Sequence, residues 1–136
     1  MTVEELQAAL DREDNGVLRP GGHRPGREFC ALEFDAKVRG RGWSDTPITL
    51  PDLRALNDAK WSSDQARTQA LLPVMSALWN WAEWSPVRQQ AWATRMSRET
   101  IRQIVAELPS LPDVVRQACR GVETLEEAQK AARAAK

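Results

Sequence analysis

The chain of 136 residues has no tyrosine, one histidine, two cysteines and no excess of charge of either sign. A single histidine excludes histidine-rich metal sites and an acid/base pair of two histidines. Cys30 and Cys119 are too few for the disulfide framework of a small secreted domain, so we expect two free thiols. The 19 basic and 19 acidic side chains exclude nucleic-acid binding by bulk charge alone.

The sequence also lacks an apolar run of the ~20 residues that span a bilayer. Its first residues, MTVEELQAALDRED, are acidic and amphipathic, unlike the basic start and apolar stretch of an export signal. Phosphate-binding glycine loops, dinucleotide fingerprints, zinc-protease helices and nucleophile elbows are missing from the sequence. We therefore expect a cytoplasmic location, no membrane contact, no cofactor and no bound metal. Whether the chain is an enzyme stays open.

Apolar residues recur at helical spacing along most of the chain, between clear start and stop signals. Capping boxes at Thr2 and Thr124, an N-cap serine at Ser63 and the Ser85-Pro86 pair mark helix starts. Pro73 is expected to kink or divide its helix, and a break is expected near Ser97. The expected helices cover residues 2–14, 28–39, 51–60, 63–79, 85–108, 113–120 and 124–136.

This pattern predicts an all-α fold, an irregular single-domain bundle of six to seven helices spanning residues 1–136. Four glycines and two prolines between Gly16 and Gly26 predict a loop after the first helix. The last helix has little apolar bulk, and we expect it to fray. The main alternative is a β-strand over Phe29 to Val38.

Polar residues that could carry chemistry gather in the first half of the chain. A histidine and a thiolate are zinc ligands, and Cys30 and Glu33 lie on one face of the expected helix. A nucleophilic Cys30 would need His23 as its base. The structural interpretation is a buried Cys30, a Glu33 that caps a helix or pairs with an arginine, and a His23 that orders the loop. The candidate residues are His23, Cys30, Glu33, Asp45, Asn57 and Asp58.

These residues resemble a signature of small uncharacterised bacterial and phage proteins, GGH…CxxE…SDxP…ND. The resemblance covers residues 21–58, from Gly21 to Asp58. Those proteins often have a cysteine soon after SDxP, whereas this chain continues Ile48-Thr49-Leu50-Pro51. The resemblance implies a recurrent structural or ligand-binding unit, and no established activity comes with it. Polar side chains are a less natural signature for packing than apolar ones would be.

Tryptophans cluster from Trp79 to Trp92. On one helix Trp81 and Trp84 would lie a turn apart with Trp79 pointing elsewhere, so at least one ring should reach the surface. Exposed aromatic rings anchor partners or stack on bases. The structural interpretation is that they fill gaps between helices.

Arginines recur every seven residues at Arg88, Arg95 and Arg102, with Arg98 one turn before the last. On a single helix they would form a basic stripe beside Trp92, opposed only by Glu99. Arginine with aromatic rings can hold single-stranded nucleic acid or a phosphate group. The structural interpretation is a solvated face paired with carboxylates elsewhere in the fold.

Three functions follow from these features. The first is a non-enzymatic helical interaction or accessory module that uses the His23 loop and the tryptophans to bind another protein or an anionic ligand. The second is a small enzyme or ligand-binding protein, with or without a metal ion, built on His23, Cys30, Glu33, Asp45 and Asp58. The third, less favoured, is nucleic-acid binding through the arginine stripe.

Overall fold

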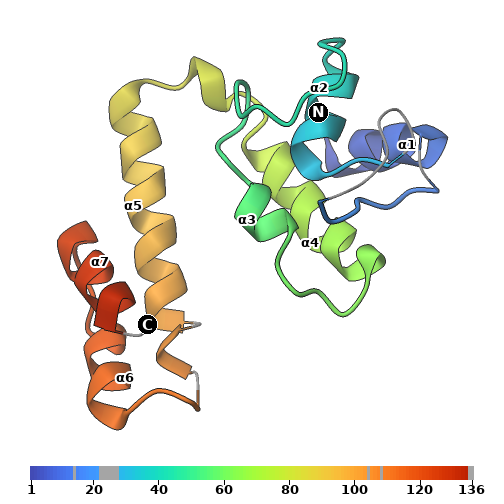
Figure 1. Ribbon diagram of the computed structural model, residues 1–136. Coiled ribbons are helices and arrows are strands. Elements are labelled where there is room, and N and C mark those ends of the chain that lie inside the picture. Colours follow the sequence, from blue (N-terminus) through green and yellow to red (C-terminus); the bar gives the residue numbers. More distant parts are fainter. Residues whose placement is uncertain (14, 22–27, 104, 108, 135–136) are drawn as a thin grey trace. The chain divides into compact units, whose positions relative to one another are not determined.

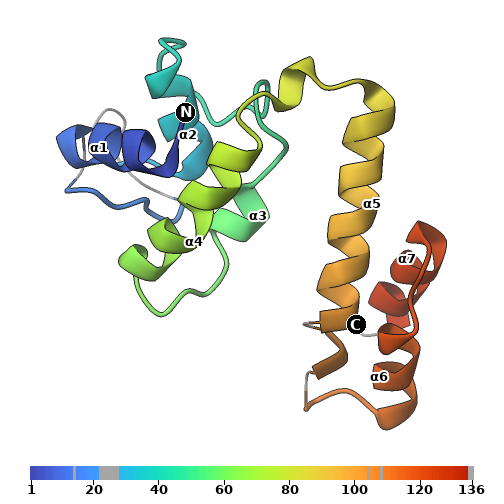
Figure 2. The same cartoon turned by 180° about the vertical axis from the view of Figure 1, so that it is seen from behind.

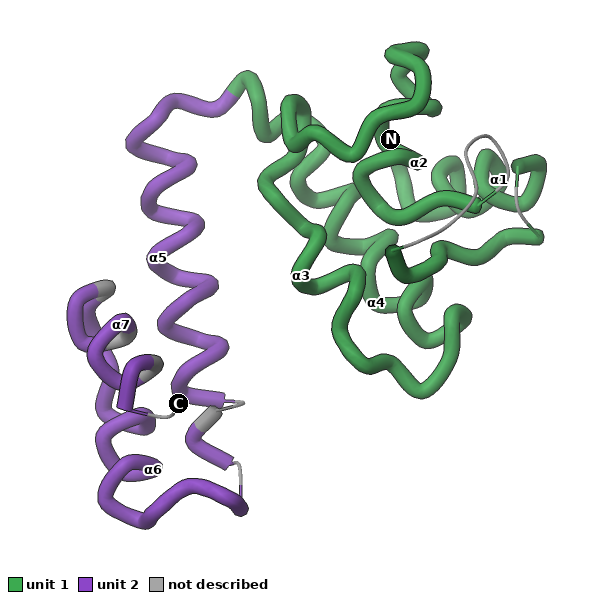
Figure 3. The backbone as a smooth tube through the Cα atoms, in the orientation of Figure 1, with its two compact units in different colours: residues 1–83 green, residues 84–136 purple. Residues whose placement is uncertain are grey.

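The computed structural model describes residues 1–13, 15–21, 28–103, 105–107 and 109–134. Over these residues it contains seven α-helices, two short 3-10 turns and no strand, which confirms the all-α prediction (Figure 1). The chain divides into two compact units, residues 1–83 and 84–136 (Figure 3). The single domain expected over residues 1–136 stays a prediction.

The first unit contains four α-helices and one 3-10 turn. Its apolar interior is formed by large side chains, including Leu10, Phe34, Leu71 and Met75, all fully buried. The helix α1 packs against α4, and α2 packs against α3. The elements are α1 (Val3–Glu13), α2 (Ala31–Val38), α3 (Arg54–Asn57), α4 (Asp64–Ala77) and η1 (Trp81–Glu83).

The second unit contains α5 (Pro86–Gln103), η2 (Val105–Glu107), α6 (Asp113–Arg120) and α7 (Leu125–Ala134). Both α6 and α7 lie against the C-terminal half of α5 (Figure 1 and Figure 2). The core cluster of this unit is made of smaller side chains than the interior of the first unit: Ile101, Ala106, Cys119, Val122 and Ala131, with Val115 packed against them.

Four of the predicted helix starts are confirmed by side-chain caps. The Thr2 hydroxyl accepts from Glu5 N–H at 3.1 Å, while Glu5 Oε2 accepts from Thr2 N–H at 2.8 Å. Thr124 and Glu127 exchange the same pair of bonds before α7. The hydroxyls of Ser63 and Ser85 accept from the backbone three residues on, at 3.0 and 3.2 Å. These bonds satisfy N–H groups that the first helical turn leaves unpaired.

The prediction of helix rather than strand over Phe29–Val38 is confirmed, but α2 begins at Ala31, not at Glu28. The Phe29 carbonyl accepts a hydrogen bond from Arg19 N–H at 2.8 Å, so it is not available to the helix. The next predicted helix, residues 51–60, shrinks to the four residues of α3. Asp52 accepts from the backbone N–H and the guanidinium of Arg54, which holds residues 51–53 in a turn before α3.

The described helices contain neither a division at Pro73 nor a break near Ser97. The helix α4 continues through Pro73 to Ala77, and α5 continues through Ser97 to Gln103, short of the Leu108 that we expected. The predicted bounds of α6 are confirmed. The last helix is described through Ala134 and contributes the buried Ala131 to the core, while residues 135–136 lie outside the described part. None of the described helices is long and apolar enough to cross a membrane.

Candidate functional site

Cys30 and Glu33 form the start of α2. Cys30 is the N-cap residue, and the Glu33 carboxylate accepts from the Cys30 backbone N–H at 3.1 Å. Both side chains are buried. Burial raises the pKa of the Cys30 thiol to about 12, so the thiol stays protonated at neutral pH. The structural interpretation of these two residues is therefore confirmed: Cys30 is a buried free thiol and Glu33 caps a helix.

The other proposed partners of Cys30 do not form a described site with it. His23 and Gly22 lie outside the described residues. Asp45 is exposed in the turn before Pro47, and within the described part of the chain no hydrogen bond joins it to Cys30 or Glu33. The same part holds no group of three His, Cys, Asp or Glu side chains that could bind a metal ion.

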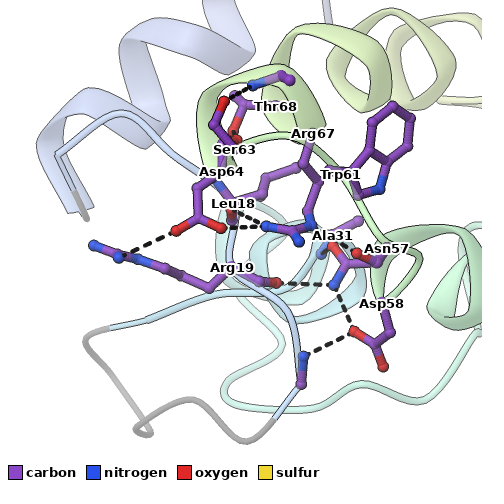
Figure 4. Close-up of polar contacts among 12 residues, drawn as sticks. Leu18, Arg19, Ala31, Asn57, Asp58, Trp61, Ser63, Asp64, Arg67 and Thr68 are labelled. Atoms are coloured by element: carbon purple, nitrogen blue, oxygen red, sulfur yellow. Dashed lines mark hydrogen bonds and ion pairs between the residues drawn. The ribbon is translucent and has the colours of Figure 1, made fainter.

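Asn57 is the centre of a buried polar network (Figure 4). Its side-chain oxygen accepts from Ala31 N–H at 3.0 Å, and its amide nitrogen donates to the Arg19 carbonyl at 2.8 Å. The same nitrogen donates to Asp58 Oδ1 at 2.9 Å. One side chain thereby ties the start of α2 and the segment around Arg19 to the end of α3.

Asp58 extends this network to Gly21. Its Oδ1 accepts from Gly21 N–H at 2.8 Å, and a Cβ atom placed on Gly21 would lie 3.1 Å from Asp58 Oδ2. A larger residue at position 21 would therefore crowd the carboxylate that binds its own backbone. Gly21, Asn57 and Asp58, three members of the signature, act together to fix the backbone at residue 21.

The sequence analysis missed Arg67, which lies on the other side of the network. Arg67 is only 5% exposed, and its Nε donates to the Asn57 carbonyl at 2.6 Å. Its Nη1 donates to the Leu18 carbonyl at 3.4 Å and to Asp64. Its position in the sequence could have indicated burial, because Arg67 lies four residues before the buried Leu71 and so shares a helix face with it.

A second buried acid, Asp35, was also missed. Its carboxylate pairs with Arg39 Nε at 2.6 Å and Arg41 Nη2 at 3.0 Å, and it accepts from the Thr49 hydroxyl. Arg39 also stacks on Trp79, with its Cζ 3.7 Å from the ring centroid. This cluster holds the segment after α2 in place, and the i,i+4 spacing of Asp35 and Arg39 was its sequence signal.

The tryptophans do not share a helix as the sequence suggested. The helix α4 ends at Ala77, Trp81 opens the 3-10 turn η1, and Trp84 precedes α5. Trp79, Trp81, Trp84 and Trp92 are all half-buried, so each ring keeps part of its surface accessible. The most exposed tryptophan is Trp43 outside this cluster, at 38%, and it stacks against Phe29 with ring centroids 5.0 Å apart.

The arginine stripe does form on one helix, because α5 is uninterrupted from Pro86 to Gln103. Arg88 lies over the ring of Trp84, 3.8 Å from its centroid. Arg95 is exposed and has no hydrogen bond or ion pair with the described residues. Arg98 pairs with Glu99 at 3.4 Å, and Arg102 with Glu123 at 3.7 Å. Carboxylates therefore neutralise Arg98 and Arg102, whereas Arg88 and Arg95 have no acidic partner among the described residues.

Comparison with known proteins adds no relative, since no family model, curated protein or solved structure matches the chain.

Proposed function

We propose that this chain is a non-enzymatic helical interaction module that binds an acidic partner through the exposed arginines of α5. The observation that carries the proposal is the exposure of this helix: of its 18 residues, only Ile101 is buried. Helices of globular proteins are normally held by an apolar face packed on the rest of the fold. The first three turns of α5 instead present the guanidinium groups of Arg88, which lies over the half-buried ring of Trp84, and of Arg95, and neither has an ion pair with the described residues.

The alternative of an enzymatic or ligand-binding site in the first unit has less support. Cys30 is buried and protonated at neutral pH, and the carboxylate of Glu33 caps α2. Asn57 and Asp58 use their side chains to hold backbone groups of residues 19, 21 and 31. Side chains engaged in this way stabilise the fold, and substrate binding would have to break their hydrogen bonds.

The proposal is tested by binding of the full chain to poly-L-glutamate, measured by isothermal titration calorimetry at low and moderate salt. We expect the double variant Arg88→Gln, Arg95→Gln to lose at least tenfold in affinity. The matched control is Arg12→Gln, Arg133→Gln, which removes the same charge from exposed arginines of α1 and α7. Equal losses in both double variants would contradict the proposal, because binding would then follow net charge and not α5.

Nucleic-acid binding is the second candidate, and the stacked Arg88–Trp84 pair favours it. Such a pair could hold a phosphate and a base of a single strand. A 20-nucleotide oligo(dT) tests it: affinity should fall steeply with salt and be lost in Trp84→Ala, Arg88→Gln. Affinity that does not depend on salt would rule this candidate out.

A further inference from the structure

In the C-terminal part of α5, other elements of the second unit cover one face of the helix with an apolar contact and an ion pair. Ile101 is buried in the core cluster of the second unit. The next residue, Arg102, pairs with Glu123 just before α7, with Nη1 3.7 Å from Oε1. The arrangement therefore consists of an apolar residue that packs on neighbouring elements, followed by an arginine that pairs with an acidic side chain.

The heptad spacing repeats twice toward the start of α5, with the half-buried Thr94 at the apolar position of the first repeat and the exposed Val87 at that of the second. Seven residues before Ile101 and Arg102 stand Thr94 and Arg95, and seven before those stand Val87 and Arg88. Ala91 and Arg98 fall between them at the spacing of a heptad seam. Val87 is 79% exposed, so the seam is open at its first turn.

These positions also line a groove along α5. It has a volume of about 820 Å³ and is bordered by Pro86, Val87, Gln90, Ala91, Thr94, Arg95 and Arg98. Two of its lining side chains, Ala91 and Thr94, are small, which lets another backbone approach closely. Arg95 and Arg98 border the groove, and Arg88 lies outside its lining, one heptad or ~10.5 Å before Arg95 along the helix.

Building on the proposed function, we propose that the partner is an acidic amphipathic helix that lies along residues 87–98 of α5 and continues the packing begun at Ile101. A helix is favoured because its own side chains repeat at the same heptad period as Val87, Thr94 and the arginines. Acidic residues at its flanking positions would pair with Arg88 and Arg95 as Glu123 pairs with Arg102. A second copy of α5 is a poor occupant, because this helix carries four arginines and one acid, Glu99.

The test uses two synthetic peptides of 21 residues and identical composition. In the first, leucine and alanine occupy the a and d positions and glutamate the e and g positions, whereas the second has the same residues in shuffled order. Binding to the full chain is measured by calorimetry. We expect the patterned peptide to bind at least tenfold more tightly than the shuffled one, and to gain helical circular dichroism on binding.

Charge reversal sharpens the test. The variant Arg88→Glu, Arg95→Glu should lose at least tenfold in affinity for the patterned peptide, and a peptide with lysine in place of glutamate should recover it. Ala91→Trp should also weaken binding by filling the groove without a change of charge. The control variant Arg12→Glu, Arg133→Glu should bind the glutamate peptide and the lysine peptide with affinities within twofold of those of the wild-type chain. Circular dichroism of each variant confirms that the helices are intact.

The outcomes separate this inference from the function on which it rests. If patterned peptide, shuffled peptide and poly-L-glutamate bind equally and all depend on the α5 arginines, acidic binding stands and the helical partner is wrong. The inference is also wrong if oligo(dT) binds more tightly than the patterned peptide with the same dependence on Arg88 and Arg95. If no probe depends on those arginines, both proposals fail.

Discussion

The two units of this chain use their charged and polar residues in opposite ways. In the first unit Asn57, Arg67 and Asp35 are buried, and each binds several neighbouring groups. In the second unit Arg88 and Arg95 lie on the exposed face of a helix, and the core is built from smaller side chains. The contrast teaches that a polar residue singled out in a sequence is a binding candidate only when the fold leaves its hydrogen-bonding groups unused.

The largest expected effect on stability at neutral pH is that of Asn57→Ala. It leaves the buried Ala31 N–H and the Arg19 carbonyl without their partner, at an expected cost of about 3 kcal/mol in the free energy of unfolding. Urea unfolding followed by far-UV circular dichroism measures this. Asn80→Ala is the control, because Asn80 is exposed in the same unit and should cost under about 0.5 kcal/mol. Similar costs for both variants would remove the distinction between buried and exposed polar residues.

The next effect concerns pH and the Cys30 thiol. Its pKa is raised by burial to about 12 in the folded chain, so the folded state holds this proton more tightly than the unfolded state. The stabilisation is therefore complete below pH 9 and is lost as pH rises from 9 to 12, by at most about 1.4 kcal/mol per pH unit. Unfolding free energies of wild type and Cys30→Ala, compared across this range, should converge. Parallel curves would show that Cys30 titrates normally.

A smaller effect is expected for Gly21→Ala. The added methyl would lie 3.1 Å from Asp58 Oδ2, and the crowding should cost about 1 kcal/mol. In an Asp58→Ala background the same change should cost less, since the crowded carboxylate is gone. A double-mutant cycle of unfolding free energies measures the coupling. A coupling of zero would mean that Gly21 and Asp58 do not constrain each other.

The smallest effect on stability is expected for Arg95→Gln, within about 0.5 kcal/mol, because this side chain makes no described contact that folding requires. Thermal unfolding of the variant and of Arg67→Gln provides the comparison. Arg67 donates to two buried carbonyls, and its substitution should cost several times more. If Arg95→Gln destabilises the chain as much, α5 is covered in solution and its proposed binding role is wrong.

Helix starts were the part of the fold that local sequence could predict. Thr2, Ser63 and Thr124 carry their capping chemistry within three or four residues, so a short window contains the whole interaction. The late start of α2 was not predictable in this way. It depends on the bond from Arg19 N–H to the Phe29 carbonyl, whose two residues are too far apart in sequence for a short window to contain both.

The candidate site shows the same limit. The sequence pointed to Asn57 and Asp58, but their partners Gly21, Ala31 and Arg67 come from distant positions. Arg67 looked like one of many arginines, because burial is set by the packing of α4 and not by its neighbours in sequence. The stripe of Arg88 and Arg95 was predictable, since a heptad period within one helix needs no tertiary information.

Each unit contains tryptophans, so its fluorescence can be observed separately once the tryptophans of the other unit are replaced. The chain has no tyrosine, so its near-ultraviolet emission comes almost entirely from six tryptophans. Trp43, Trp61, Trp79 and Trp81 belong to residues 1–83, and Trp84 and Trp92 to residues 84–136. With the first four replaced by phenylalanine, the remaining fluorescence would report on the start of α5 alone. Binding of a ligand beside Arg88 would then shift the wavelength of the remaining tryptophan emission.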